Sequence, residues 1–222
     1  MNESRPRYQR LSLTFYSMPS KTTSRVPARR GRKRKPRLLE LTITLAGIEP
    51  SIWRRVMVPD TYSLHQLHRV IQLVFGWLDY HLYSFQAGER RFEQPLDGAE
   101  DEDSTVILLS DLELGKKARF IYRYDFGDNW LLEIIVDDIH IVSPLDESDE
   151  RLLPKLYAGE RAGPPEDCGG PHGYAHMLEA MQNPEHPEHE DYRRWAGNYD
   201  PEQFDLRMVR NNLALAAAWG TV

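Results

Sequence analysis

The sequence predicts an α+β fold: a mainly antiparallel sheet, one early helix packed on it and a helical C-terminal third. Segments in which apolar and polar residues alternate, the pattern of a half-buried strand, fill much of the region between residues 38 and 137. Helical patterns gather after residue 170. Strands therefore precede most of the helices, without the regular strand–helix alternation of a parallel sheet.

Residues 39–58 are expected to form a β-hairpin. Residues 39–45 alternate strictly between apolar and polar types, which indicates a strand with one buried face. The sequence GIEP at 47–50 turns the chain, and residues 52–58 form the second strand. Pro59 and Asp60 end it.

A helix is expected directly after this hairpin. Ser63 is its cap, because Gln66 stands at the offset of a capping box. Gly76 suits the left-handed position that follows a helix. The residues of its apolar stripe, spaced by three and four, are Leu64, Leu67, His68, Ile71, Val74 and Phe75.

Further strands and helices complete the predicted domain. The remaining strand patterns are residues 81–87, 106–109, 118–124 and 130–137. The last two are expected to pair as a hairpin across residues 125–129. Residues 93–104 are an acidic loop, and residues 145–165 are mostly irregular. The predicted C-terminal helices run from Pro171 to about 182, over 188–196, and onward from Asp205 as a cap.

The composition is that of a globular protein. Of 222 residues, 41% are hydrophobic, which is enough for a real core. The single cysteine excludes an internal disulfide and a multi-cysteine zinc site. No stretch approaches the roughly 18 apolar residues of a membrane span, and the N-terminus lacks the apolar segment of a secretory signal. We therefore expect a cytoplasmic protein that does not contact membranes.

The charge is divided unevenly along the chain. Residues 1–37 carry a net charge of about +11, whereas residues 38–222 carry about −17. We expect a disordered basic arm, residues 1–37, and a single α+β domain, residues 38–222. Dense Lys and Arg displace counterions from phosphates, so nucleic acid is one expected partner of the arm. The alternative is a solvated extension, or residues translated from a start codon upstream of the true one.

Two acidic segments that contain glycines are the most distinctive motifs in the sequence. The first signature, residues 122–130, reads YRYDFGDNW, and the second signature, residues 163–174, reads GPPEDCGGPHGY. Each combines carboxylates, glycines and aromatic residues within a dozen positions. Such segments must bend sharply and place charges at fixed points.

With other features in the same order, the two signatures resemble the plasmid pRiA4b ORF-3-like family. The likeness covers roughly residues 36–215. It implies a compact α+β domain without an established activity, and some members are labelled passenger proteins of mobile elements. The other matching features are Leu41–Leu45, GIEP at 47–50, IWRR at 52–55, Leu67-His68, Ile71-Gln72, Gly76-Trp77, and His81-Leu82 with Phe85.

The chain departs from the family pattern at two positions. The family usually has a histidine two residues after the tryptophan of the first signature, where this chain has Leu132. The family also tends to have histidine at the position of Tyr83. If those histidines serve a metal or an acid–base role, this member has lost it.

We predict that the signatures form one polar cluster at an edge of the sheet. Because nearby carboxylates repel one another, an arginine or a cation must join them if they converge. We expect that Arg54 or Arg55 pairs with these carboxylates. A bound divalent cation such as Ca²⁺ or Mg²⁺ is the second choice. The predicted members are Arg54, Arg55, His68, His81, Asp125, Asp128, Glu166 and Asp167.

Structural roles compete with this hypothesis. Asp125 or Asp128 would bond turn amides around a Gly127 of positive φ. Glu166 and Asp167 would complement the following helix dipole. His68 would be a core histidine bonded to backbone, or would pair with His81 or an acid from one of the signatures.

Two further groups have weaker claims to chemistry, and the tryptophans have a structural role. Cys168 stands near a helix start, which can lower the pKa of a thiol. His172, His176 and Glu179 share one helix face, either as zinc ligands or as a solvated surface. The tryptophans at 53, 77 and 130 are expected to be core anchors.

We expect a binding module rather than an enzyme, with its ligand surface between the two signatures and the aromatic strands. No catalytic residue is assigned, and no cofactor is expected beyond the divalent cation. The alternative is a metal-dependent or hydrolase-like enzyme. It would use Asp125, Asp128, Glu166 and Asp167 with His68 or His81.

Overall fold

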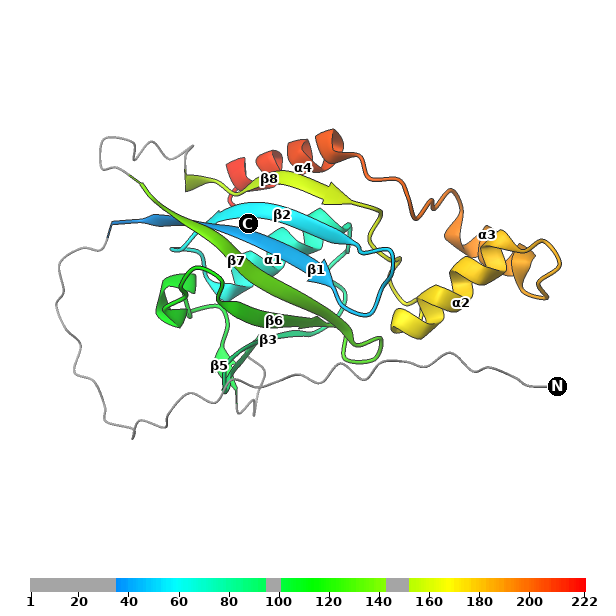
Figure 1. Ribbon diagram of the computed structural model, residues 1–222, viewed down its shortest axis with the longest axis horizontal. Coiled ribbons are helices and arrows are strands. Elements are labelled where there is room, and N and C mark those ends of the chain that lie inside the picture. Colours follow the sequence, from blue (N-terminus) through cyan, green and yellow to red (C-terminus); the bar gives the residue numbers. More distant parts are fainter. Residues whose placement is uncertain (1–34, 95–100, 143–151) are drawn as a thin grey trace. The chain divides into compact units, whose positions relative to one another are not determined.

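The computed structural model describes residues 35–94, 101–142 and 152–222, and over these ranges the chain is an α+β protein (Figure 1). The strands are β1 (Arg37–Leu45), β2 (Trp53–Pro59), β3 (Tyr83–Ala87), β4 (Arg90–Glu93), β5 (Glu102–Asp103), β6 (Arg119–Tyr124), β7 (Trp130–Ile141) and β8 (Lys155–Glu160). They form one sheet in the order β5-β4-β3-β6-β7-β1-β2-β8. Its pairs are antiparallel except β4 with β5, so the predicted fold class is confirmed.

Both predicted hairpins are present. β1 pairs with β2, and β6 pairs with β7. The alternation in β1 buries Leu39, Leu41, Ile43 and Leu45 while the residues between them are half-buried. One face of the strand therefore enters the core, as the period of two predicts.

Helix α1 (Leu64–Phe75) packs its apolar stripe into the core, which it shares with the sheet. The Ser63 side chain accepts from the Gln66 N–H, and the Gln66 side chain accepts from the Ser63 N–H, so the capping box is confirmed. Gly76 ends the helix at φ 81°. The loop from residue 77 to residue 82 then returns the chain to β3.

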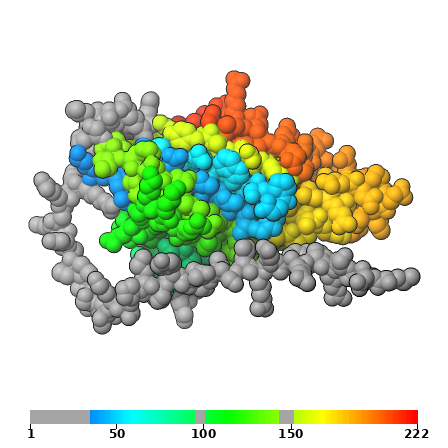
Figure 2. Space-filling model, viewed as in Figure 1, coloured from blue at the N-terminus to red at the C-terminus, as the bar shows by residue number. Residues whose placement is uncertain are grey.

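The C-terminal third is helical, as predicted. It holds α2 (Gly170–Gln182), α3 (His189–Ala196) and α4 (Leu206–Ala218), the last capped by Asp205. Helix α4 lies along β8 and contacts α1. Helices α2 and α3 lie together beyond one end of the strands (Figures 1 and 2). Helix α3 has no buried residue.

Two predictions about local structure are wrong, and one strand was not predicted. Residues 106–109 form a single bridge, Ser63 with Leu108, and lead into a 3₁₀ helix, Leu109–Leu112, instead of a strand. The segment 145–165, expected to be mostly irregular, contains the strand that was not predicted, β8. That edge strand has only Leu156 buried, so its hydrophobic pattern is weak. Trp53 is half-buried and donates to Glu160, whereas Trp77 and Trp130 are core residues.

The predicted basic arm lies outside the described residues, apart from residues 35–37. Arg37 belongs to β1, where its side chain donates to Asp60 at 2.7 Å. Residues 95–100 of the acidic loop and residues 145–151 of the 145–165 segment also lie outside the described ranges. Among the helices that the structure describes, none is both long enough and apolar enough to cross a membrane.

Candidate functional site

The two signatures are in direct contact where the β6–β7 turn meets the segment before α2. The Gly169 N–H donates to Asp128 Oδ2 at 3.1 Å. A side chain on Gly170 would place its Cβ only 2.1 Å from the carbonyl oxygen of Asp128. Gly170 also has a φ of 67°, a left-handed conformation that glycine adopts readily. The contact between the signatures therefore combines a hydrogen bond to the Asp128 side chain with a close approach of the two backbones at Gly170.

His81 lies among three carboxylates, and we call His81, Asp125, Glu166 and Asp167 the His81 cluster. The distances from His81 Nε2 are 3.1 Å to Asp167 Oδ1, 3.7 Å to Asp125 Oδ2 and 3.9 Å to Glu166 Oε2. This Nε2 atom is buried, and it has no hydrogen-bond partner among the described residues. The loop before β3, the β6–β7 turn and the segment before α2 each contribute to the cluster.

Glu166 is held through one of its two oxygens. Its Oε1 accepts from the Leu78 N–H at 2.8 Å and from the Tyr124 hydroxyl at 2.9 Å. Burial, together with the neighbouring Glu166, raises the pKa of Tyr124, so the phenol keeps its proton and remains a donor. The other oxygen, Oε2, is buried without a hydrogen-bond partner among the described residues.

Asp125 is oriented by the turn that it begins. Its Oδ1 accepts from the Gly127 N–H at 2.8 Å, which leaves Oδ2 on the side of His81. The left-handed conformation expected at Gly127 occurs instead at Asp125, with φ 52°, and at Asn129, with φ 59°. Aspartate and asparagine tolerate this region because their short side chains bond locally.

The cluster is buried on one side and open on the other. The side chains of Asp125 and Glu166 are 10% and 12% exposed, whereas that of Asp167 is 67% exposed. Asp167 also lines a pocket of about 290 Å³. The other residues of the pocket wall are Cys168, Glu188, Asp191, Tyr192 and Trp195.

The expected arginine partners are elsewhere, so that prediction is wrong. Arg54 is buried and donates to four backbone carbonyls rather than to a carboxylate. Its guanidinium lies 4.9 Å and 3.8 Å from the ring centres of Phe75 and Phe204. Arg55 points to the opposite side of β2 and lies 3.9 Å from Glu40. Successive strand residues face opposite ways, and neither faces the signatures.

His68 is also outside the His81 cluster, in a buried network of its own. Its Nδ1 lies 2.8 Å from the Tyr122 hydroxyl, and its Nε2 lies 2.7 Å from Asp79 Oδ1. Burial lowers the pKa of His68 although Asp79 opposes this effect, so the imidazole is neutral at pH 7. The expectation of backbone partners is wrong, because its partners are side chains.

The two positions at which the family usually has histidine are structural in this chain. The Tyr83 hydroxyl lies 2.8 Å from both His65 Nδ1 and Ser104 Oγ. Leu132 is completely buried in the core and pairs with Tyr122 across the β6–β7 ladder.

Cys168 lacks the environment of a nucleophile. Burial, with the nearby negative charge of Asp128, raises the pKa of this thiol to about 12. The expected lowering by a helix start does not occur. A thiol protonated at neutral pH is a poor nucleophile.

Sequence reasoning missed two residues near His176. His176 Nε2 contacts Glu188 Oε2 at 2.7 Å, and its ring meets that of His186 edge-on at 5.2 Å. The prediction had placed His176 with Glu179, one turn along the same helix. His186 and Glu188 come from the connection between α2 and α3, and no helical spacing links them to His176.

Comparisons with known proteins agree with this fold. The model of the plasmid pRiA4b ORF-3-like protein family matches residues 37–208. The uncharacterized protein y4hQ of Sinorhizobium fredii is 34% identical over 189 residues, which cover 82% of this chain and 94% of that protein. A crystal structure of MM3350, a protein of unknown function from Methanosarcina mazei Go1, is 36% identical, with a TM-score of 0.68, and the match covers 79% of this chain and 98% of that one. The chain belongs to the plasmid pRiA4b ORF-3-like family.

Proposed function

We propose that this protein is a binding module whose central element is a divalent cation held by the His81 cluster. The observation that carries the proposal is the buried Nε2 of His81, which has no hydrogen-bond partner among the described residues yet lies within 3.9 Å of three carboxylates. Leaving a buried polar atom unsatisfied costs about 1–3 kcal/mol. A cation would accept the Nε2 lone pair together with carboxylate oxygens of Asp125 and Asp167, because one ligand atom from each of the three residues lies within 4.8 Å of the other two.

The balance of charge supports a cation. Within the described chain, His81 is the one basic side chain that lies within 4.0 Å of the carboxylates of Asp125, Glu166 and Asp167. Even a protonated imidazole would neutralise only one of three negative charges. Arg54 and Arg55, the alternative sources of positive charge, are engaged elsewhere. The repulsion between the carboxylates is therefore left for a bound ion to relieve.

The distances suit a small metal ion. Metal–ligand bonds of about 2.0–2.2 Å place two ligand atoms on opposite sides of an ion roughly 4 Å apart, and closer when they are adjacent. The three distances from His81 Nε2, between 3.1 and 3.9 Å, fall within this limit. An imidazole favours transition metals and carboxylates favour Mg²⁺ and Mn²⁺. Mn²⁺, which accepts both donor types, is the best probe.

The open side of the cluster indicates where a ligand would enter. Asp167 is mostly exposed and borders the pocket that Tyr192 and Trp195 help to line. A cation with a free coordination position there would hold an oxygen atom of a small molecule in that pocket. A metal-dependent hydrolase is the second candidate, favoured by the same exposed carboxylate. Asp167 could accept a proton from a metal-bound water.

Metal binding tests the first proposal directly. Full-length protein would be titrated with Mn²⁺ and the bound metal counted after dialysis, for the wild type, His81→Ala and Asp125→Asn. His140→Ala is the matched control, because His140 is an imidazole 3.5 Å from a single carboxylate, Glu40. We expect one bound equivalent in the wild type and the control, and a loss in both cluster variants. Equal Mn²⁺ binding by the wild type and His81→Ala would overturn the proposal.

The hydrolase alternative needs a separate assay. A generic phosphodiester or carboxylic ester would be incubated with the Mn²⁺-loaded wild type and with Asp167→Asn. Turnover that disappears in Asp167→Asn while the metal is retained would favour the enzyme. Metal binding without turnover in the wild type would favour the binding module.

A further inference from the structure

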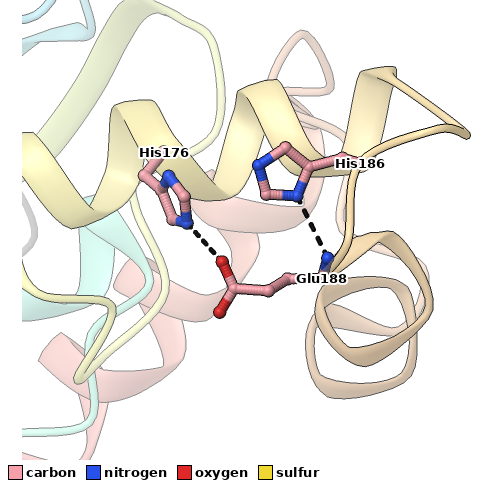
Figure 3. A group of neighbouring side chains, drawn as sticks. All are labelled: His176, His186 and Glu188. Atoms are coloured by element: carbon pink, nitrogen blue, oxygen red, sulfur yellow. Dashed lines mark hydrogen bonds and ion pairs between the residues drawn. The ribbon is translucent and has the colours of Figure 1, made fainter.

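A second group of metal-ligating side chains lies away from the His81 cluster, at the junction of α2 and α3. His176 stands on α2, and His186 and Glu188 belong to the connection that leads into α3 (Figure 3). The three side chains point toward one another, and one ligand atom from each lies within 4.8 Å of the other two. We call these three residues the α2–α3 clasp.

The clasp joins the start of α3 to α2. Helix α3 is eight residues long and has no buried residue. A helix of that length is unstable by itself in water. The other contacts between its first residues and α2 include one hydrogen bond, from His189 Nδ1 to the carbonyl oxygen of Ala180 at 2.8 Å. The clasp therefore adds to the other contacts that fix α3, which include the packing of the partly buried Tyr192 and Ala196 against the core.

Glu188 shows that the helix start is organised around the clasp. It occupies the N-cap position of α3, yet its side chain makes no capping hydrogen bond. The carboxylate is turned to His176 Nε2 at 2.7 Å, and the backbone N–H of Glu188 donates to His186 Nδ1 at 3.2 Å. A carboxylate at this position would otherwise favour the free N–H groups of its own helix.

We propose that the α2–α3 clasp is a Zn²⁺ site that fastens α3 to α2. Two imidazoles and one carboxylate are a donor set that Zn²⁺ takes in proteins, with water or a ligand in the fourth position. Tetrahedral bonds of about 2.0–2.1 Å separate ligand atoms by roughly 3.4 Å. His176 Nε2 and Glu188 Oε2, 2.7 Å apart, would move apart slightly, and His186, whose ligand atom lies within 4.8 Å of both, would move inward if it lies beyond the tetrahedral separation. Rotation of half-exposed side chains provides such shifts.

The clasp and the His81 cluster differ in the metal that they suit. The clasp has two imidazoles for one carboxylate, whereas the His81 cluster has one imidazole for three carboxylates. Nitrogen-rich sites favour Zn²⁺ over Mn²⁺ and Mg²⁺. Glu188 also lines the pocket that Asp167 borders, so a zinc ion at the clasp would fix one wall of that pocket.

Zinc titration of the full chain tests this proposal. Bound Zn²⁺ would be counted, and the melting temperature measured, for the wild type, His186→Ala, Glu188→Gln and the control His140→Ala. We expect both clasp variants to bind one equivalent less than the wild type and to lose the rise in melting temperature that this equivalent causes. Glu188→Gln preserves the shape of the side chain, so loss of zinc in that variant reports ligation and not misfolding.

The outcome is independent of the His81 cluster. His81→Ala should keep the zinc equivalent that His186→Ala removes. If the wild type and His186→Ala bind the same number of zinc ions, the clasp is only a hydrogen-bonded contact and the zinc proposal is overturned. That result would leave Mn²⁺ binding by the His81 cluster untouched.

Discussion

Arg54 offers a direct test of how this fold is held together. It lies in β2 opposite Gly159 of β8, where the cross-strand neighbour has no side chain to exclude it. Its guanidinium donates to the carbonyl oxygens of Val74 at 2.6 Å and Arg161 at 2.8 Å, and also to two others at 2.8 Å. Burial lowers its pKa only to about 9, so the group keeps its charge at pH 7.

Arg54→Met keeps most of the volume and removes every donor. The acceptors in the two fully buried bonds, the carbonyls of Val74 and Arg161, would each lose a partner. A buried acceptor left unsatisfied costs about 1–3 kcal/mol, so the two together cost about 2–6 kcal/mol. This is a large part of the roughly 5–15 kcal/mol that stabilises a typical domain.

Arg55→Met is the matched control for this measurement. Arg55 is the next residue in the same strand, but its side chain is 46% exposed and lies 3.9 Å from its carboxylate partner. Its substitution should change the free energy of unfolding by no more than about 0.5 kcal/mol. Urea unfolding, followed by circular dichroism, would compare both variants with the wild type. If Arg54→Met lies within 1 kcal/mol of Arg55→Met, roughly the lower limit of one lost acceptor, the carbonyls are satisfied in another way and the reasoning fails.

Three further measurements test other parts of the structure. Because burial lowers the pKa of His68, the unfolded chain binds a proton below about pH 6.5 that the folded chain does not. The free energy of unfolding should therefore fall as the pH drops below that value, and His68→Gln should show a shallower decline. Cys168, whose pKa is about 12, should react with iodoacetamide at pH 8 roughly a thousand times more slowly than in the urea-unfolded chain, and equal rates would contradict its burial. Gly170→Ala should destabilise the protein more than Gly88→Ala: both glycines have positive φ, but only the first would place a Cβ against Asp128, and equal losses would exclude the steric clash.

The fold was predictable because its patterns are local. The alternation in β1 and the capping box of α1 each depend on residues within one element, and the structure contains both. Strand β8 was not predicted because an edge strand with one buried residue has almost no hydrophobic periodicity. Trp53 was misjudged for a similar reason: an aromatic side chain in a strand indicates burial only if it lies on the inward face.

The candidate site was predictable only in part. The sequence identified His81, Asp125, Glu166 and Asp167, because acids beside glycines in sharp bends are uncommon in ordinary loops. The source of positive charge was not predictable, because Arg54 could face either a carboxylate or a set of carbonyls. The spacing of residues in the sequence does not show whether a carboxylate or a set of carbonyl groups lies next to Arg54 in the folded protein. The α2–α3 clasp was missed for the same reason, since its ligands come from two elements.

The glycines and the acids of the two signatures have different roles in the structure. A Cβ on Gly170 would lie 2.1 Å from the Asp128 carbonyl oxygen, and one on Gly173 would lie 1.9 Å from that of Cys168. Without a side chain at Gly173, α2 can pack against a residue that precedes it, Cys168, and without one at Gly170, the start of α2 can rest directly on the β6–β7 turn. That contact brings Glu166 and Asp167 within 4 Å of the same imidazole nitrogen as Asp125. A larger residue at Gly170 would force the two backbones apart and separate the carboxylates of the two signatures. The glycines thus set the distance at which the acids can act on one ligand.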